Sequence, residues 1–281
     1  MPITYLDLYH ADGMWVMPSE WDRNHHAYKH GTGKLLHSGY HFVDLASWLL
    51  GCNSRLHDEV LELSVRSYQP ADFLKLFSGS YTHLFGRKGI PLRPPETVRG
   101  YGEMDLYLLG QIKARGYVRT TLSMHLQQNS FSRRSWSSPS ADPYKGAGRV
   151  RHERMNLQVG TLLNIQVHSY QSHEIRDAVP HKVYGPGHLD HFDVLVFRNC
   201  DLVGGERFER REVGAEEIDV DLGHNELARR TLLEAFLEGA PAGSSLESHA
   251  RTNELLAAIY DCLDSEAGAG TIPWHTTEGE A

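Results

Sequence analysis

The chain has 281 residues, 40% of them hydrophobic, which is enough for one substantial core or at most two modest ones. Its net charge of -8 argues against a nucleic-acid-binding protein, because such proteins draw most of their affinity from clustered Lys and Arg. No run approaches the roughly 18 apolar residues of a membrane span, and the three cysteines form no CxxC pair, so we expect a cytoplasmic protein with no membrane partner.

The first predicted element lies in residues 31–51, GTGKLLHSGYHFVDLASWLLG, where a glycine-rich lead-in precedes an amphipathic run. Four apolar residues at helical spacing predict a helix that begins near Ser38 and has Gly51 as its cap: Phe42, Leu45, Ala46 and Leu49. His37 and His41 then lie about one turn apart at the helix start, where free N–H groups and the helix dipole favour anions. The spacing leaves three uses open for this pair: capping, proton transfer and metal binding.

Alternation of apolar and polar residues predicts four strands along the rest of the chain. They are expected within residues 56–66, 117–127, 156–172 and 190–200. The last is apolar on both faces, so we expect it in the centre of a sheet or under a helix. In the third, Asn164, Gln166 and His168 form a polar face for solvent, a partner subunit or a substrate.

Two long loops interrupt the strands, at residues 70–100 and 128–153, where Ser, Gly, Pro and Arg prevail. The second loop contains a local basic patch, which either is a solvated surface or receives an anionic group: Arg133, Arg134, Lys145, Arg149 and Arg151.

Two helices are predicted near the C-terminus. The first covers residues 224–239, with Gly239 as its cap and an apolar stripe of Ala228, Leu232, Ala235 and Phe236. The second begins with a capping box from Ser244 to Glu247 and has an apolar face of Leu255, Ala258, Ile259 and Cys262. Residues 269–281 are expected to form a flexible tail.

This order of elements predicts a single α+β domain over residues 1–268, with a mainly antiparallel open sheet covered by helices on one face. No dinucleotide-binding Rossmann domain is expected. The candidate glycine pairs, Gly146 with Gly148 and Gly185 with Gly187, lack the third glycine of GxGxxG and do not follow a strand–helix–strand pattern.

The first helix also carries a family resemblance. The order of Gly31, Gly33, Leu35, Gly39, His41, Asp44, Trp48 and Gly51 resembles a signature of the glucose-fructose oxidoreductase, inositol dehydrogenase and MocA-like family. Residues 236–268, FLEGAPAGSSLESHARTNELLAAIYDCLDSEAG, resemble the closing pair of helices of the same family, with Cys262 in place of a serine. Together the similarity covers roughly Trp21 to Gly268 and points to the C-terminal, substrate-binding domain.

The resemblance implies roles for particular residues. His41 takes the position of the histidine that exchanges a proton with a sugar or polyol hydroxyl, and His37 replaces an aspartate that usually precedes it. Trp21, Arg23 and His26 are implied to line the same pocket, and we add the polar strand residues Asn164 and His168 as candidates for substrate binding. No metal ligand and no cofactor-binding residue is assigned in this chain.

The resemblance also implies NAD or NADP as cofactor and a dimer or tetramer that forms through the open sheet face. The family's segment with a catalytic lysine, EKP, does not occur here, so we expect the substrate-binding half alone, inactive without a dinucleotide-binding domain. Two alternatives stay open. One is a non-catalytic binding or scaffold module, and the other is a metal-dependent isomerase or hydrolase that uses His37, His41, His168, His173, His188 and His191.

Overall fold

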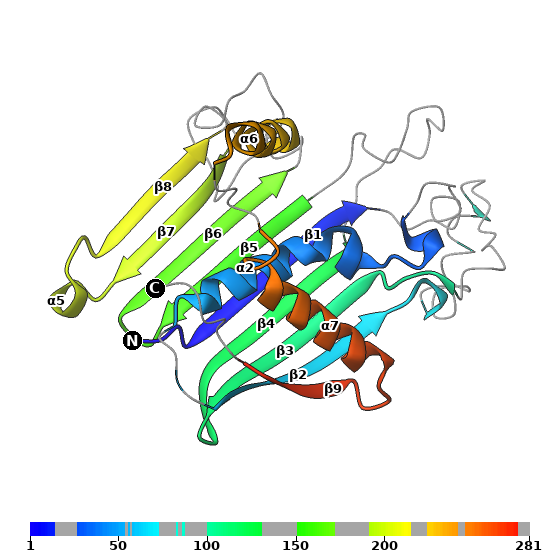
Figure 1. The fold of residues 1–281 in the computed structure, drawn as a ribbon, viewed down its shortest axis with the longest axis horizontal. Coiled ribbons are helices and arrows are strands. Elements are labelled where there is room, and N and C mark those ends of the chain that lie inside the picture. The colour runs from blue at the N-terminus through cyan, green and yellow to red at the C-terminus, as the bar shows by residue number, and fades with distance from the viewer. Residues whose placement is uncertain are drawn as a thin grey trace.

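A computed structural model of the protein describes residues 1–14, 27–53, 56, 58–72, 83, 86–87, 100–130, 151–171, 191–214, 224–240 and 245–274. Within these residues, nine strands form one sheet in the order β8-β7-β6-β5-β1-β4-β3-β2-β9 (Figure 1). The strands are β1 (Tyr5–Met14), β2 (Glu59–Tyr68), β3 (Asp105–Ala114), β4 (Tyr117–Asn129), β5 (Arg151–Val159), β6 (Leu163–Gln171), β7 (His191–Arg198), β8 (Phe208–Gly214) and β9 (Ala269–Pro273).

The sheet is mostly antiparallel. Among the described strands, β1 and β4 form the parallel pair, with Leu6 opposite Leu122 and Leu8 opposite Met124, while the other seven pairs are antiparallel. A parallel pair requires a long crossover connection, and here β2, β3 and the α2 helix separate β1 from β4 along the chain.

Helices lie on one side of this sheet (Figure 1). The principal ones are α2 (Tyr40–Gly51), which follows the short π-helical turn η2 (Leu35–Gly39), and α7 (Ala250–Asp264). We call the side that faces them the helix side and the other the open side. The remaining helices given bounds within the described residues are η1 (Ala27–His30), α5 (Cys200–Val203) and α6 (His224–Glu238). No described helix is long and apolar enough to span a membrane.

The core lies between β1–β4 and the two principal helices, and the burial pattern follows the residue spacing. Side chains at alternate positions of β1, such as Leu6 and Leu8, are buried against Val43 and Leu50 of α2 and Ile259 of α7. Burial at period 2 in the strands and at period 3.6 in the helices is what an amphipathic sheet and amphipathic helices produce. The predicted α+β class, with helices on one face, is confirmed.

The structure corrects several element boundaries. The segment 156–172, expected as one strand, contains parts of two within its described residues: β5 and β6 form a hairpin whose turn begins at Gly160, with a φ of +52°. The strand expected near the sheet centre, β7, lies second from the β8 edge. Val194 and Val196 of β7 are only half-buried, so the run of apolar residues on this strand does not mean that it lies at the sheet centre.

The tail prediction was wrong for residues 269–274. Residues 269–273 form β9, which pairs with β2, and Trp274 is buried in the core. The loop boundaries also change, because residues 128–129 extend β4 and residues 151–153 begin β5. Of the basic patch expected in that loop, Arg151 therefore lies on a strand, while its other members lie outside the described residues.

Helix boundaries differ as well. Gly51 is the last helical residue of α2 rather than a cap in the left-handed region. At the start of α7, Ser245 and Ser248 exchange hydrogen bonds, with Ser248 N donating to Ser245 Oγ at 3.1 Å, and the helix begins only at Ala250. The helix predicted over residues 224–239 is confirmed as α6, followed by Gly239 with a φ of +65°.

Candidate functional site

The start of the α2 region is occupied by a carboxylate of the protein itself. Glu103, in the segment that leads into β3, accepts a hydrogen bond from the Leu35 backbone N at 2.8 Å, and its carbonyl accepts one from Lys34 N at 2.7 Å. Burial raises the pKa of Glu103, while the Leu35 hydrogen bond acts in the opposite direction. The anion that a helix start favours is therefore supplied from within the chain.

This contact explains the glycine lead-in. A Cβ at Gly33 would lie 1.8 Å from the Glu103 carboxylate, and one at Gly102 would lie 2.3 Å from Gly33 N. A Cβ at Gly39 would lie 2.6 Å from Leu126 of β4. The glycines are thus required by close packing of the lead-in against the β3 segment and β4, which fixes the position of the histidines that follow.

A buried ion pair lies beneath the same segment. Lys34 is fully buried and its Nζ lies 2.5 Å from Oδ2 of Asp12, near the end of β1. A buried lysine is tolerated when a carboxylate compensates its charge at close range, and this pair joins the lead-in to the sheet.

His10, two residues before Asp12, extends the charged group towards β5. Its Nε2 lies 3.6 Å from Asp12 Oδ1 and 3.4 Å from Glu153 Oε1, and it accepts a hydrogen bond from Arg151 Nε at 3.3 Å. Arg151 and Glu153 also form an ion pair with each other at 2.5 Å. We call these five residues the charged cluster: His10, Asp12, Lys34, Arg151 and Glu153.

The cluster extends from a buried floor to the surface. His10, Asp12 and Lys34 are buried, while Arg151 and Glu153 are partly exposed. The His10 ring stacks on Phe42, with the centroids 4.7 Å apart and an interplanar angle of 22°. Phe42 directly follows His41, so the buried part of the cluster supports the first turn of α2.

His41 is exposed at the start of α2, and the centroid of its ring lies 3.9 Å from that of the Tyr40 ring. Partial desolvation lowers its pKa; the Asp44 charge opposes this, the Arg151 charge adds to it, and Glu153 opposes it again. The imidazole is therefore neutral at neutral pH and able to accept a proton. The charges that act on it come from its own helix and from the surface end of the charged cluster.

His37 lies in η2, one turn before His41, and its side chain is exposed. Its backbone N donates to Gly33 O at 2.9 Å, which closes the turn after the glycines. Asp44, which follows in α2, accepts from Thr252 Oγ1 at 2.7 Å and lies 3.0 Å from His249 Nδ1, so this carboxylate links α2 to α7.

The other predicted site residues do not join this group. Trp21, Arg23 and His26 lie outside the described residues. Asn164 and His168 lie on β6 with their side chains on the open side, because His168 pairs with Arg154, which pairs with Tyr9 next to the helix-side residues Leu8 and His10. The sheet thus separates Asn164 and His168 from His41.

The open side has its own polar network. Asn164 Nδ2 donates to Asn156 at 2.6 Å, Gln166 donates to Asn164 at 2.8 Å, and His168 lies 3.2 Å from Gln166 Oε1. On the neighbouring strands Arg154 binds Asp7 at 3.2 Å and lies over the Tyr9 ring. The open side of β1, β5 and β6 therefore presents amides, imidazoles and aromatic rings.

A metal centre finds no support in the described part of the chain, where no group of three His, Cys, Asp or Glu side chains could hold an ion. His168 is on the opposite side of the sheet from His37 and His41, and the side chains of His173, His188 and His191 lie outside the described residues.

A dinucleotide does not fit the described residues either. Cradles for a pyrophosphate use free N–H groups at a helix start after a parallel strand. Here the Glu103 carboxyl group fills the space beside Gly33 and accepts the hydrogen bond of Leu35 N, so neither the space nor this N–H is free for a phosphate. The glycine pairs at residues 146–148 and 185–187 lie outside the described residues.

Sequence reasoning proposed His41 and did not mark the residues that the structure places near the start of the α2 region: His10, Asp12, Lys34, Glu103 and Glu153. The sequence carries only a weak signal for these residues, because their contacts join distant positions; Leu35 and Glu103, for example, are 68 residues apart. Arg151 was noticed only as one member of a basic loop. Hydropathy alone predicts an exposed lysine at position 34, because lysine is almost never fully buried unless its charge is paired.

Within the described residues, this mostly antiparallel sheet with helices on one side is an α+β fold rather than a doubly wound dinucleotide-binding fold. No protein-family model and no curated protein matches the sequence.

Solved structures do match. They include a proposed myo-inositol dehydrogenase from Sinorhizobium meliloti, at 11% identity and a TM-score of 0.41, over 97% of this chain and 57% of that one. GenD2 from gentamicin A biosynthesis, solved in complex with NAD, matches at 13% identity and a TM-score of 0.44, over 98% and 56%. An oxidoreductase from Sinorhizobium meliloti matches at 11% identity and a TM-score of 0.43, over 96% and 57%.

The chain thus spans a little over half the length of these three structures. Inositol dehydrogenases were named in the sequence resemblance, and a proposed one is among the structures that match this chain.

Proposed function

We propose that the chain is the substrate-binding and oligomerisation part of an NAD(P)-dependent oxidoreductase that acts on a sugar, a polyol or a related hydroxyl compound. The observation that carries the proposal is the position of His41. An exposed, neutral imidazole stands at the start of α2, beside the partly exposed Arg151–Glu153 pair and above the buried floor of the charged cluster.

The chemistry of this arrangement is proton exchange with a hydroxyl group. When a hydroxyl is oxidised to a carbonyl, its O–H proton must pass to a base, and an imidazole that is neutral at neutral pH is suited to accept it. The start of the α2 region is filled by Glu103, so we assign only the proton acceptor to this surface and propose that a separate dinucleotide-binding domain supplies the nicotinamide.

Arg151 and Glu153 supply complementary groups for a polyhydroxylated ligand. A guanidinium donates hydrogen bonds in a plane and a carboxylate accepts them, so the pair can bind neighbouring hydroxyls of opposite hydrogen-bonding sense. The network behind them, His10 with Asp12 and Lys34, holds both side chains at the strand end. Trp21, Arg23 and His26 remain proposed contributors to the same pocket.

Calorimetric titration of the purified chain with a panel of sugars and polyols tests the proposal. At least one compound is expected to bind, with an affinity that His41→Ala weakens about tenfold or more, equivalent to about 1.4 kcal/mol. His125→Ala is the matched control, because His125 lies on β4 beside Tyr107 of the open side. Tight NADH binding by the chain alone, or equal effects of the two substitutions, contradicts the proposal.

A second candidate is a non-catalytic binding module of the same fold. The imidazole of His37 favours it, because an imidazole cannot stabilise a protonated His41 as the aspartate implied at this position would. In this case the ligand still binds at His41, but no dinucleotide-binding protein that joins the chain produces turnover.

The same proposal assigns the open side to pairing with a second copy, as a dimer or as part of a tetramer. Leu109 of β3 is an exposed apolar residue on this side, where it lies opposite Ser64 and Ser123. Leu109→Glu is expected to dissociate that pair in sedimentation velocity, since two copies would bring the new carboxylates together. An unchanged sedimentation coefficient speaks against the assignment.

A further inference from the structure

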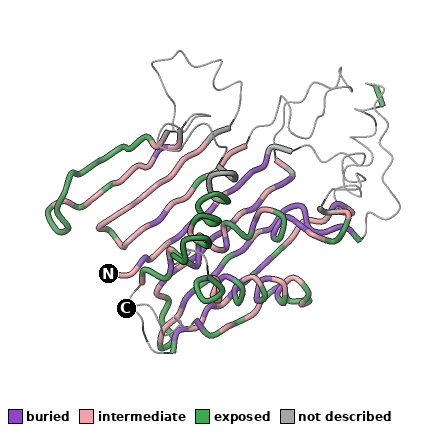
Figure 2. Tube along the Cα trace, turned by 45° about the horizontal axis from the view of Figure 1, so that its top comes forward, coloured by how far each residue is buried: buried purple, intermediate pink, exposed green. Residues whose placement is uncertain are grey.

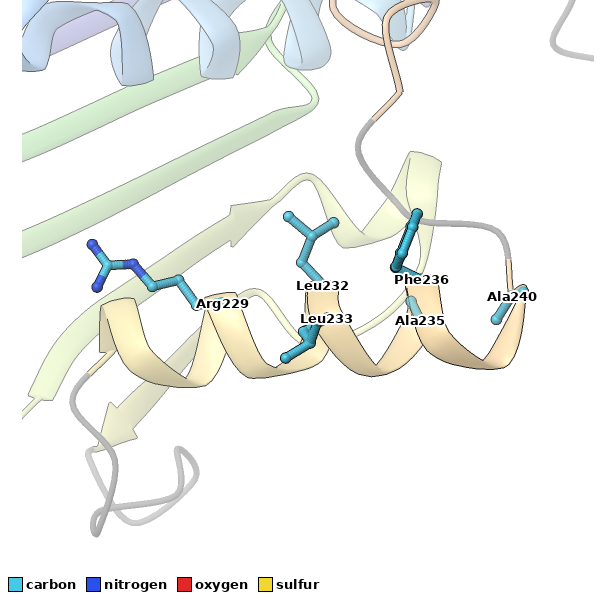
Figure 3. A pocket seen from close by; sticks show the side chains of 7 residues that line it. Arg229, Leu232, Leu233, Ala235, Phe236 and Ala240 are labelled. Carbon is cyan, nitrogen blue, oxygen red and sulfur yellow. The ribbon is translucent and has the colours of Figure 1, made fainter.

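The α6 helix presents apolar side chains to solvent. Leu232, Leu233, Phe236 and Leu237 are 51%, 57%, 79% and 72% exposed. Figure 3 shows the side of the helix that lines a shallow pocket, with Leu232 and Phe236 projecting in the same direction and Arg229 at one end. A helix with such a stripe gains stability from burial, so exposure of the whole stripe indicates a contact surface.

A second apolar surface lies on the helix side of β6 and β7. Five residues on this side are apolar and only half-buried, namely Leu163, Ile165, Val167, Val194 and Val196, while Ser169 and Arg198 face the same side at the strand ends. The equivalents of these five beneath α2 and α7, such as Leu6 and Leu122, are fully buried. Figure 2 shows the same contrast between half-buried β6–β7 and the buried strands of the core. Of the described helices, α2 and α7 leave β6 and β7 uncovered (Figure 1).

The α6 helix does not cover this surface within its own chain. It appears end-on in Figure 1, so its axis is steeply inclined to the sheet, whereas α2 and α7 lie along it. In that orientation the apolar side chains Leu232, Leu233, Phe236 and Leu237 are exposed. The chain therefore carries an apolar helix and an apolar sheet surface that do not meet.

The two surfaces match in size. Two neighbouring strands are about 10 Å wide, close to the diameter of a helix, and a 15-residue helix is about 22 Å long, shorter than strands of eight or nine residues. The Arg230–Glu234 ion pair, at 2.7 Å, lies on the opposite side of α6 from Phe236, so docking through the apolar stripe leaves this pair in water. The Arg229 stem can lie along the apolar contact with its guanidinium at the rim.

We propose that α6 of one copy docks on the β6–β7 surface of a second copy, and that the two copies exchange their helices reciprocally. A single helix on a sheet buries too little for a specific interface, but two such contacts related by a two-fold axis together approach the roughly 1,200 Å² that a stable dimer requires. Exchange of an identical element also gives each copy a helix over β6 and β7, which the described helices leave uncovered. This interface is independent of the proposed function and of the open side.

Disulfide trapping between two differently tagged chains tests the exchange. Cys52→Ser and Cys200→Ser first remove the two cysteines that are not buried. Chains with Phe236→Cys are then mixed with chains with Val194→Cys and oxidised mildly. A covalent heterodimer is expected, and Glu234→Cys in place of Phe236→Cys, which points the thiol away from the stripe, is expected to give at least about fivefold less.

A chain with both Phe236→Cys and Val194→Cys separates the alternatives. A disulfide within one chain means that α6 covers its own sheet and overturns the proposal, as does equal trapping through position 234. Sedimentation equilibrium of chains that also carry Leu109→Glu, which removes the proposed open-side contact, gives an independent measure. In that background Phe236→Asp is expected to weaken the dimer at least about tenfold, while Tyr117→Asp, at an equally exposed aromatic residue of the β3–β4 hairpin, leaves it unchanged. Equal dimer strength in all three proteins also overturns it.

Discussion

Lys34 and Asp12 form an ion pair that is almost entirely removed from water, with 0% and 7% of their side chains exposed and Nζ 2.5 Å from Oδ2. The pair joins the glycine lead-in of α2 to the end of β1, and Asp12 also faces His10. A buried pair of this kind gives little net stability, yet loss of one partner is costly because the other charge stays buried alone.

Lys34→Met is therefore expected to destabilise the protein by about 3–5 kcal/mol in urea unfolding, since it leaves the Asp12 carboxylate uncompensated. Lys113→Met is the matched control, because Lys113 pairs with Glu62 at 2.6 Å on partly exposed side chains. That change should cost less than about 1 kcal/mol. Similar losses in both proteins would show that burial of the Lys34–Asp12 pair has no energetic weight.

Gly33→Ala is expected to displace the lead-in from Glu103, since the new Cβ would lie 1.8 Å from the carboxylate. A loss of about 1–3 kcal/mol is predicted from overpacking. Gly100→Ala meets nothing within 4 Å and serves as the control. Thermal unfolding of both variants measures the difference, and a Gly33→Ala protein as stable as the control contradicts the packing described.

The two tryptophans at opposite extremes of exposure test the end of the fold. Trp274 is 5% exposed and follows β9, with the Arg251 guanidinium 5.2 Å from its ring, whereas Trp48 on α2 is 70% exposed. Trp274→Ala should cost about 3–5 kcal/mol through loss of buried area and the cavity left behind. Trp48→Ala should cost under about 0.5 kcal/mol. Equal unfolding free energies would place residues 269–274 in a dispensable tail.

Three histidines predict how stability varies with pH. Desolvation lowers the pKa of His41, His152 and His168 below the ordinary 6.5. Between each lowered value and 6.5 the unfolded chain binds more protons, so stability rises with pH through this window and is lost as pH falls below about 6.5. Replacement of all three by Gln should flatten the dependence of the unfolding free energy between pH 5.5 and 7, and an unchanged slope would exclude their contribution.

Some elements were predictable because their side chains alternate cleanly. The strand around Leu122, Met124 and Leu126 has apolar residues on one face and polar ones on the other, which β4 confirms. β1 escaped prediction because its inward face continues from Leu8 into His10 and Asp12, whose burial depends on partners distant in sequence. β9 is only five residues long, and no local pattern marks it.

The candidate site divides in the same way into a part that the sequence points to and a part that it does not. A spacing motif singles out His41, since the residues that define it are neighbours in sequence. The charged cluster assembles from β1, the lead-in of α2 and β5, and only the folded sheet brings Asp12, Lys34 and Glu153 together. The open-side position of His168 follows from register, because a shift by one residue would place it on the helix side.

The central claim, that His41 meets a hydroxyl-bearing ligand, is tested most directly by proton NMR titration of the histidine Cε1–H signals with a sugar or polyol that binds. We predict that the ligand shifts the His41 signal and changes the pKa of His41, while the signals of His125 and His168 on the open side do not move. A bound ligand that leaves His41 unperturbed, or that moves only the open-side histidines, would contradict the account.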